Sequence, residues 1–329
     1  MDTTFRACRV SSNNGELQAS IQAMTLAQLD PGDVVIRVHY SSINYKDALA
    51  VTGRGNIMRR MPLNAGVDLA GEVLQSSDAR FRPGALVLVT GCGLGESHDG
   101  GLADIARVPA DWVVPLPNPL SLFDAMLLGT AGFTAALAID RMEQNGQRPD
   151  QKPIAVTGAR GGVGHVALDL LLGRGYEAVA MTRHPQSADS LRALGVDTVV
   201  NYDALLCDAR SLQSAQWGGA IDNVGGDTLA WLTRTVNPRG NIASIGMAGG
   251  IDVHTSVMPF ILRGISLLGI TSANCLMEHR RKIWHRLVTD LKPQHLDKIV
   301  AGTVKLDELP GALEKILSGQ HQGRYVVEF

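Results

Sequence analysis

The stretch that decides the fold is Pro153-Ile-Ala-Val-Thr-Gly-Ala-Arg-Gly-Gly-Val-Gly-His-Val-Ala-Leu-Asp-Leu-Leu-Leu172. Its apolar run 154–157 predicts a short strand buried on both faces. From Val163 onward, apolar side chains recur at i, i+3, i+4, i+7 and i+8, which predicts a helix with one apolar stripe. A strand, a glycine turn and a helix in this order predict a pyrophosphate site, because bare backbone N–H groups and a helix N-terminus attract anions.

The glycines of this turn follow the dinucleotide fingerprint with one departure, since Ala159 stands where the first glycine is usual. Gly161 still lets a pyrophosphate approach the backbone, and Gly164 still lets the helix pack closely on the strand. The alternative is a strand-to-helix turn that binds no ligand. We expect the turn to bind the cofactor through Gly161, Gly162, Val163 and Gly164.

The next predicted strand ends in Thr182-Arg183-His184. An NAD-binding fold usually places an acid here, about twenty residues after the motif, on the ribose 2′-hydroxyl. Thr182, Arg183 and Ser187 instead offer two hydroxyls and a guanidinium, which suit a 2′-phosphate. The sequence therefore predicts NADPH as the cofactor in preference to NADH. The alternative is that Arg183 is only a solvated surface charge.

Composition limits the classes of partner. The chain has 329 residues, 45% hydrophobic and 19% charged, with a net charge of −2. This length suits about two domains, and the charge predicts no general attraction to nucleic acid or to acidic membranes. We expect a small-molecule substrate. The four cysteines show no paired spacing, no leader opens the sequence, and no apolar run reaches the roughly eighteen residues of a membrane span, so we expect a cytoplasmic protein.

The pattern along the chain predicts two domains. Residues 1–123 read as short strands and turns, and residues 124–270 as alternating strands and helices. Residues 271–329 read as a helix over 277–291, in which Ile283, Leu287 and Leu291 are spaced by four, followed by a last strand. We therefore expect an α/β cofactor-binding domain, 124–270, inserted into a β-rich domain made of 1–123 and 271–329. Ligands are expected in the cleft between them, at the carboxyl ends of the parallel strands.

Five segments also resemble a known family. They are Ser42-Ile-Asn-Tyr-Lys-Asp-Ala-Leu-Ala-Val-Thr-Gly53, Gly129-Thr-Ala-Gly-Phe-Thr134, 157–164, Val257-Met-Pro-Phe-Ile-Leu-Arg-Gly264 and Gly323-Arg324. With them the chain resembles the medium-chain dehydrogenase/reductases, and among these the zinc-free, quinone oxidoreductase-like branch that reduces acryloyl-CoA with NADPH. The resemblance implies a Rossmann domain with a doubly wound parallel sheet, inserted into a β-rich, GroES-like catalytic domain.

The resemblance also bears on metal. Asn44, Val67 and Thr130 stand where zinc-dependent relatives carry Cys, His and Cys. Since none of the three is an ordinary zinc ligand, we expect no metal. Without a Lewis acid, the expected reaction is hydride donation from NADPH to an electron-poor double bond, with the charge on the thioester oxygen held by hydrogen-bond donors.

The same resemblance implies a set of site residues. Tyr45 is expected to be the donor that orients the substrate and a candidate proton source, with Asn44 and Asp47 beside it. Tyr45 has packing as its alternative, and Asp47 has a role as a turn cap. The further cofactor contacts that the resemblance implies are Tyr45, Thr130, Tyr202, Asn223, Gly246, Ile270 and Arg324.

Coenzyme A carries phosphates, so a near-neutral chain needs local cations to bind it. Two groups qualify, one made of Arg54, Arg59 and Arg60 and the other of residues 280–282. Either group can instead be a solvated face.

Three functions stay open. The first is NADPH-dependent reduction of an enoyl thioester, most specifically acryloyl-CoA to propionyl-CoA. The second is an NADPH:quinone or enone oxidoreductase, and the third is a non-catalytic NADPH-binding protein, because a fold does not settle a function. By analogy with relatives, we expect a homodimer formed through the edges of the cofactor sheets.

Overall fold

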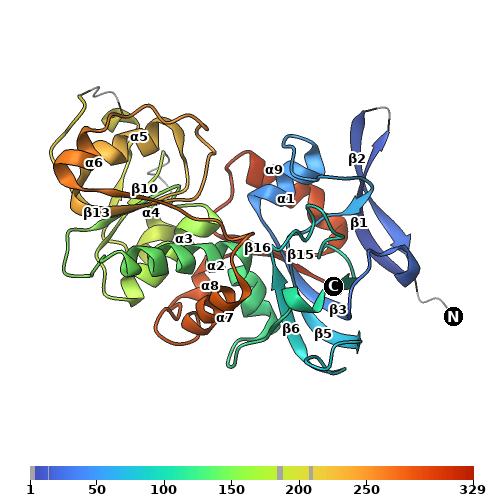
Figure 1. Ribbon diagram of the computed structural model, residues 1–329. Coiled ribbons are helices and arrows are strands. Elements are labelled where there is room, and N and C mark those ends of the chain that lie inside the picture. Colours follow the sequence, from blue (N-terminus) through green and yellow to red (C-terminus); the bar gives the residue numbers. More distant parts are fainter. Residues whose placement is uncertain (1–3, 14, 184–187, 207–209) are drawn as a thin grey trace. The chain divides into compact units, whose positions relative to one another are not determined.

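The computed structural model describes residues 4–13, 15–183, 188–206 and 210–329 (Figure 1). The chain forms two compact units. The first unit comprises Met1–Thr130, Ala273–Val288 and Val300–Phe329, and the second comprises Ala131–Ser272 and Thr289–Ile299. These divisions differ from the expected ones at 123 and 270, and they move residues 289–299 into the cofactor-binding unit.

A buried carboxylate explains why residues 289–299 join the second unit. Asp169 accepts hydrogen bonds from the backbone N–H groups of Gln294 (2.8 Å) and His295 (3.1 Å), and its second oxygen lies 2.8 Å from the His295 ring. Asp169 lies on the helix that follows the glycine turn. The segment is therefore fastened to that helix by contacts that are remote in sequence.

The second unit is built on six parallel strands, which confirms the predicted doubly wound parallel sheet. In spatial order the strands are β11 (Thr198–Val200), β10 (Ala178–Met181), β9 (Ile154–Thr157), β12 (Trp217–Asp222), β13 (Val236–Ser244) and β14 (Ser266–Gly269). The order reverses between β9 and β12, and folds of this kind bind ligands beyond the carboxyl ends of strands at such a reversal.

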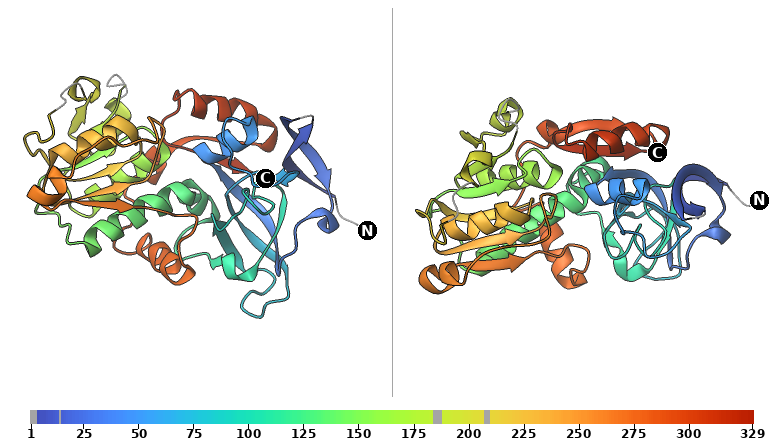
Figure 2. Two further views of the ribbon diagram at one scale, coloured as in Figure 1. Left: turned by 45° about the horizontal axis from the view of Figure 1, so that its top comes forward. Right: turned by 90° about the horizontal axis from the view of Figure 1, so that it is seen from above.

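Helices lie on both sides of this sheet (Figures 1 and 2). β9 is buried at all four positions, as its apolar run predicts. The helices of the second unit are α3 (Gly162–Gly173), α4 (Ala188–Ala193), α5 (Gly226–Thr235), α6 (Met258–Arg263), α8 (Leu296–Ile299) and the later part of α2 (Leu122–Gln144); a 3-10 turn, η4, covers Asp203–Leu205.

The first unit is built mainly of β-strands, and it also contains the first part of α2. One sheet has the order β15-β16-β3-β5-β6-β8, with β7 also paired to β3, and a smaller sheet has the order β2-β1-β4. The strands are β1 (Phe5–Asn13), β2 (Glu16–Met24), β3 (Val34–Ile43), β4 (Leu63–Asn64), β5 (Asp68–Ser76), β6 (Leu86–Thr90), β7 (Ile105–Val108), β8 (Val114–Pro115), β15 (Val300–Val304) and β16 (Arg324–Glu328). Its helices are α1 (Tyr45–Thr52), α7 (Met277–Arg286) and α9 (Leu309–Leu317), with 3-10 turns η1 (Leu26–Gln28), η2 (Ala110–Trp112) and η5 (Leu306–Glu308).

Helix α2 is long and breaks near its start. Gly129 has φ 48° and ψ −150°, outside the helical region, so the helix is two segments joined at a kink. By length and hydropathy α2 would pass for a membrane span, yet 78% of the tested window is buried inside the structure. This burial is typical of a core helix.

Candidate active site

The first unit holds a buried hydrogen-bond network centred on Asp68, the first residue of β5. The Oδ2 atom of Asp68 accepts hydrogen bonds from Ser42 Oγ (2.5 Å), Asn44 Nδ2 (2.8 Å) and the backbone N–H of Thr130 (2.8 Å). Its Oδ1 atom accepts one from Thr130 Oγ1 (2.5 Å). Asp68 is fully buried. Four donors and a nearby cation compensate its charge, which a buried carboxylate requires.

That cation is Arg324, which begins β16 and is 3% exposed. Its Nη2 lies 4.0 Å from Asp68 Oδ2, its Nη1 donates to Asn44 Oδ1 (3.0 Å) and to the carbonyl of Ile43 (3.1 Å), and its Nε donates to the carbonyl of Leu127 (3.1 Å). Burial lowers the pKa of this guanidinium, and the charge of Asp68 opposes that effect. Arg324 is thus shown as a positioning residue, and its implied contact with the cofactor stays a prediction.

The kink in α2 is what lets the helix pass the network. A Cβ atom on Gly129 would lie 2.6 Å from Ser42 Oγ, 2.7 Å from Asp68 Oδ2 and 2.8 Å from Arg324 Nη2. Its φ of +48° is also one that side chains disfavour. Glycine is therefore required here, immediately before Thr130, whose backbone and hydroxyl both bind Asp68.

Asp47 confirms the interpretation as a turn cap. Its Oδ2 accepts the backbone N–H of Asn44 (2.8 Å) at the start of α1, and its Oδ1 accepts the backbone N–H of Val67 (3.0 Å). Burial raises the pKa of the Asp47 carboxyl to about 7, and the charge of Asp68 adds to the rise. The predicted catalytic role has no geometric support, because this side chain is buried and both of its oxygens are bound by backbone amides.

Tyr45 differs from its neighbours in being accessible. It is the first residue of α1 and is 48% exposed. Within the described residues its hydroxyl makes no hydrogen bond, so it has a free donor, and both the catalytic role and the packing alternative stay predictions. Asn44, which precedes it, is 9% exposed, and its amide is engaged by Asp68 and Arg324. Of the two predicted donors, Tyr45 is the one open to a ligand.

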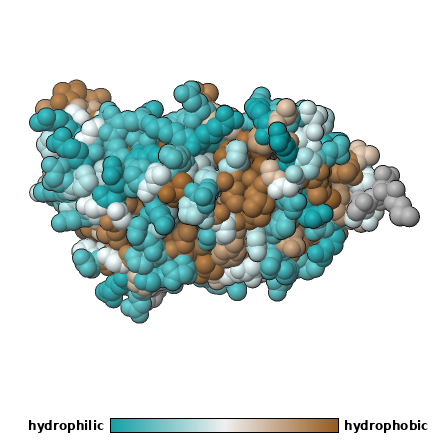
Figure 3. Space-filling view, turned by 90° about the horizontal axis from the view of Figure 1, so that it is seen from below, coloured by the Kyte–Doolittle hydropathy of each residue, from teal (hydrophilic) through white to brown (hydrophobic). Residues whose placement is uncertain are grey.

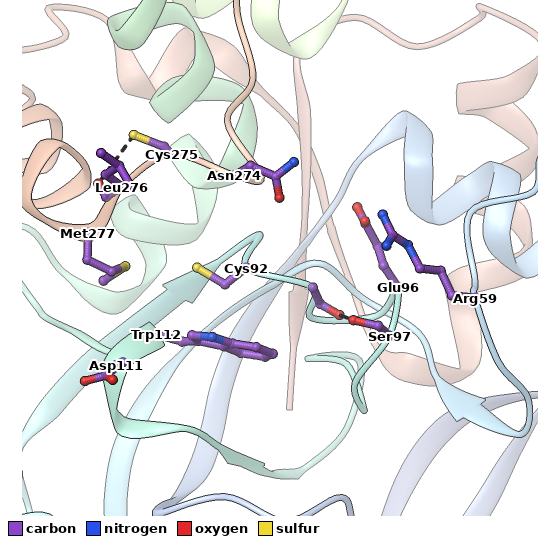
Figure 4. A pocket seen from close by; sticks show the side chains of 11 residues that line it. Arg59, Cys92, Glu96, Ser97, Asp111, Trp112, Asn274, Cys275, Leu276 and Met277 are labelled. Carbon is purple, nitrogen blue, oxygen red and sulfur yellow. Dashed lines mark hydrogen bonds between the residues drawn. The ribbon is translucent and has the colours of Figure 1, made fainter.

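The predicted arginine cluster separates into three cases. Arg60 is paired with Asp30 and donates to the carbonyl of Ser97 (3.0 Å), so the prediction that it binds coenzyme A is not supported. Arg54 is exposed. Arg59 is exposed as well, and it borders a hollow of about 460 Å³ in the first unit (Figure 4).

The second predicted cationic group, residues 280–282, loses Arg280 as a candidate contact for coenzyme A. Arg280 is fully buried and holds the end of β6, donating to the carbonyl of Thr90 (2.7 Å) and to its Oγ1 (3.0 Å). It also donates to the carbonyl of Ala273 (3.2 Å). A coenzyme A contact through Arg280 is therefore wrong, because the side chain points into the first unit.

In the second unit, the glycine turn has the shape that a phosphate site needs. Gly158 has φ +59°, and the N–H of Gly161 donates to its carbonyl (2.9 Å) before α3 begins at Gly162. A Cβ atom on Gly164 would lie 2.4 Å from that carbonyl oxygen, so only glycine lets the helix approach this closely. The first backbone N–H groups of a helix have no partner within it, and residues 162–164 present theirs at this turn.

An orphaned cation in the turn fits an anionic cofactor. The Nε atom of Arg160 is buried and has no hydrogen-bond partner among the residues that the structure describes. Burial lowers the pKa of this guanidinium, and no acid offsets it. A half-buried charge without a partner is costly, and a bound phosphate would compensate it. Arg160 was not among the residues predicted from the sequence, although a guanidinium inside a glycine turn can be recognised there.

An acid from another element pairs with Arg183, which follows β10, and this pairing was not predicted from the sequence. Arg183 Nε donates to Asp203 Oδ1 (2.9 Å), and its guanidinium lies 5.6 Å from the centre of the Tyr202 ring. The acid comes from η4, about twenty positions further along, rather than from the tip itself. Thr182 is buried at the end of the strand. Ser187 lies outside the described residues.

The remaining predicted cofactor residues follow three neighbouring strands. Asn223 follows β12, and its Nδ2 donates to the carbonyl of Thr157 (2.8 Å). Gly246 follows β13, and a Cβ atom there would lie 2.1 Å from the carbonyl oxygen of Asn223. Ile270 follows β14, with its N–H bound to the carbonyl of Ser244 (3.0 Å). Parallel strands end at one edge of the sheet, so these three residues share that edge; their contact with a cofactor stays a prediction.

No three His, Cys, Asp or Glu side chains gather as metal ligands within the part of the chain that the structure describes. At the positions where zinc-dependent relatives carry cysteines, the Asn44 amide and the Thr130 hydroxyl both bind Asp68. The polar atoms of both side chains are thus engaged in hydrogen bonds to Asp68.

Two family models match the chain. Residues 30–118 match the alcohol dehydrogenase GroES-like domain, and residues 162–289 match the zinc-binding dehydrogenase family. Among solved structures, the yhdH oxidoreductase of Salmonella enterica in complex with NADP superposes with a TM-score of 0.95 at 41% identity, covering 98% of this chain and 99% of that one. The Bacillus subtilis protein yhfP with NAD bound gives 0.96 at 46% identity, covering 99% and 100%.

Named relatives that match the chain in sequence are oxidoreductases as well. The putative quinone oxidoreductase YhfP of Bacillus subtilis is 46% identical over the whole of both chains. The probable acrylyl-CoA reductase AcuI of Escherichia coli is 43% identical over 98% of this chain and 99% of the relative. The chain therefore belongs to the medium-chain dehydrogenase/reductase superfamily, in the zinc-free branch that holds the acrylyl-CoA reductases and their quinone oxidoreductase-like relatives.

Proposed function

We propose that the protein reduces the activated C=C bond of an enoyl thioester with NADPH, converting acryloyl-CoA to propionyl-CoA. The identity to acrylyl-CoA reductases over nearly the whole of both chains supports this substrate. The single structural observation that carries the proposal is the Asp68 network, which takes up Asn44 and Thr130 and leaves the Tyr45 hydroxyl open. A free donor next to a site in which Asn44, Val67 and Thr130 stand in place of the Cys, His and Cys of zinc-dependent relatives suits a polarised alkene better than an alcohol.

The protein's own groups act on the developing charge. When bound, NADPH supplies the hydride that goes to the β-carbon of the enoyl group. Tyr45 donates a hydrogen bond to the thioester oxygen, where negative charge develops, and is the proposed source of the proton for the α-carbon. Asp47 and Asn44 fix the N-terminus of α1, on which Tyr45 lies, and Asp68 and Arg324 hold Asn44 in turn.

The cofactor residues divide by the part of the molecule that they serve. The backbone of Gly161, Gly162, Val163 and Gly164 would hold the pyrophosphate, with the Arg160 guanidinium beside it. Thr182 and Arg183, with the ring of Tyr202, would hold the ribose 2′-phosphate. The NADP complex of the Salmonella relative supports NADP(H) as the cofactor, and the residues named for each part of it are our proposal.

One panel of acceptors tests the reaction: NADPH oxidation with acryloyl-CoA, crotonyl-CoA, a benzoquinone and no acceptor. We expect the fastest turnover with acryloyl-CoA. The identity to a putative quinone oxidoreductase makes quinone reduction the second candidate, and activity on benzoquinone alone would establish it. NADPH binding with no turnover on any acceptor would favour a non-catalytic role instead.

We also propose a homodimer. β14 is the edge strand of the cofactor sheet, and exposed apolar side chains lie on it and on α6 before it: Val257, Met258, Ile261, Leu262 and Leu267. In Figure 3 apolar residues gather at the end of the second unit where Figure 1 shows α6. An unpaired edge strand flanked by apolar surface is suited to pairing with a second copy.

For the compartment, we propose the cytoplasm. The three described cysteines, Cys8, Cys92 and Cys275, are free thiols. Free thiols are typical of a reducing compartment.

A further inference from the structure

The hollow beside Arg59 lies wholly within the first unit, and none of its lining residues takes part in the chemical step described above. Its volume is about 460 Å³. Figure 4 shows its wall formed by the loop that carries Cys92, Glu96 and Ser97, by Trp112, and by the segment 274–277. The backbone fixes the relation of two of these parts, because the N–H of Cys92 donates to the carbonyl of Ala273 (3.2 Å).

Among the described charged side chains that line the hollow, Arg59 differs from Glu96 and Asp111 in having no ion-pair partner. Glu96 is paired with Lys46 (2.8 Å), and Asp111 is paired with Arg80 (2.7 Å). The side chain of Arg59, by contrast, has no hydrogen bond or ion pair among the described residues. Its backbone N–H donates to the carbonyl of Glu96 (2.7 Å), which holds the backbone of Arg59 next to the loop that lines the hollow. The hollow thus offers a free guanidinium to an anion.

The same hollow has an aromatic wall held in place. His98 packs edge-on against Trp112, with ring centres 5.1 Å apart. Gly93, at φ +97°, leaves space that a Cβ atom would fill at 2.7 Å from Ser97 Oγ and 3.6 Å from the indole. In Figure 4 the indole is seen nearly edge-on, with Cys92 above its face. An indole and a guanidinium that line the same hollow are a pair of groups that can bind a nucleobase and its phosphate.

The wall of the hollow is also tied to the proposed catalytic donor. Lys46, whose ammonium group holds Glu96, is the residue after Tyr45 at the start of α1. A ligand in the hollow therefore lies against a loop that is joined directly to the helix turn carrying Tyr45.

We propose that this hollow binds the nucleotide end of the coenzyme A thioester, with adenine against Trp112 and a phosphate on Arg59. The proposal rests on the function proposed above and deepens it. It selects Arg59 from the arginines that the sequence offered, and it gives no part to Arg60 or Arg280, which are bound within the protein.

The test compares two substrates that share the reacting group. Acryloyl-CoA carries the nucleotide, and the acryloyl ester of N-acetylcysteamine lacks it. Arg59→Glu should raise KM for acryloyl-CoA at least about tenfold and change KM for the short ester less than about twofold. The reason is that only acryloyl-CoA carries a phosphate that Arg59 can contact. The matched control is Arg82→Glu, an exposed arginine of the same unit that does not border the hollow.

A binding measurement tests the aromatic wall. Adding free coenzyme A should quench tryptophan fluorescence in the wild-type protein and not in Trp112→Phe, since Trp217, Trp231 and Trp284 are buried. Equal losses for both esters in Arg59→Glu, equal losses in Arg59→Glu and Arg82→Glu, or quenching that survives in Trp112→Phe would each overturn the inference. If wild type reduces the short ester, the proposed function stands even when the inference falls; if it reduces neither ester, both fall.

Discussion

At the scale of single residues, the buried carboxyls of Asp68 and Asp47 in the first unit have different hydrogen-bond partners. The side chain of Asp68 accepts hydrogen bonds from four donor groups on three residues. Asp47 binds two backbone amides, and its pKa is raised to about 7 by burial and by the charge of Asp68. A carboxyl whose pKa is raised on folding binds its proton more tightly in the folded state. Its contribution to stability is therefore present at acid pH and is lost as the pH rises.

This gives a prediction for pH dependence. As the pH rises from about 4 through about 7, the free energy of unfolding should fall by an amount on the order of 2–4 kcal/mol from Asp47 alone. Asp47→Asn keeps one acceptor and cannot ionise, so it should show a flatter dependence over that range. Urea unfolding of both proteins at a series of pH values measures the difference. Parallel curves would show that Asp47 does not titrate in this window.

Two arginines of the second unit should separate the parts of the cofactor. Arg183→Ala removes the cation proposed for the 2′-phosphate, so KM for NADPH should rise at least about tenfold while KM for NADH changes less than about twofold. Asp203→Asn is the control, because it keeps Arg183 and removes only its paired acid. Equal effects of Arg183→Ala on both cofactors would refute the assignment.

Arg160 should behave differently from Arg183. NADPH and NADH share a pyrophosphate, so Arg160→Ser should weaken both to a similar extent, by about tenfold. Isothermal titration with NADP⁺ and NAD⁺ measures the two losses directly. Loss confined to NADP⁺ would place Arg160 at the 2′-phosphate, and no loss would leave it without a ligand.

At the scale of elements, local patterns were predictable and interruptions were not. The β9–turn–α3 unit was predictable because its strand, glycines and apolar stripe are contiguous in sequence. The helix expected over 277–291 ends at Arg286, and the chain then turns, with the N–H of Val288 bound to the carbonyl of His285. Pro293 follows closely, and the residue before a proline disfavours the helical region. The helical spacing of apolar residues therefore continues beyond the end of α7, and the prediction placed the end of the helix too late.

The kink of α2 leads to a stability prediction. Gly129→Ala should be strongly destabilising, by roughly 3 kcal/mol or more, because the added methyl group collides with the Asp68 network and the positive φ is strained as well. Gly146→Ala is the control, since Gly146 also has a positive φ (81°) but nothing lies within 4 Å of its Cβ position. It should cost about 1–2 kcal/mol. Denaturant midpoints compare the two, and equal losses would mean that the network imposes no steric demand at Gly129.

At the scale of the whole molecule, strand pairing brings together residues that lie far apart in the sequence. Motif resemblance identified Tyr45, Asn44 and the glycine turn, but nothing in the sequence connected Asp68 with Ser42 or Arg324. Ser42 and Arg324 lie 282 positions apart, and they meet because β16 pairs antiparallel with β3, with Val326 opposite Ser42. Pairings of this range follow from the fold and cannot be read from local pattern.

The proposed dimer is tested at the same scale. Ile261→Asp combined with Leu262→Asp places two charges on the exposed apolar surface of α6 and should convert a dimer into a monomer, because burying an unpaired charge in an interface is costly. Light scattering coupled to size-exclusion chromatography gives the mass. Ile21→Asp, on a partly exposed apolar residue of the first unit, should leave the mass unchanged. A monomeric wild type would reject the dimer itself.

The position of Arg324 has a consequence for biosynthesis. It is held by Leu127, Ile43 and Asn44, yet it is translated about two hundred residues or more after each of them. While the nascent chain is still on the ribosome, Asp68 is made without its cation. A product that stops before residue 324 would hold a buried carboxylate facing no guanidinium, and proteases of the cell would find such a truncated chain easier to open and remove.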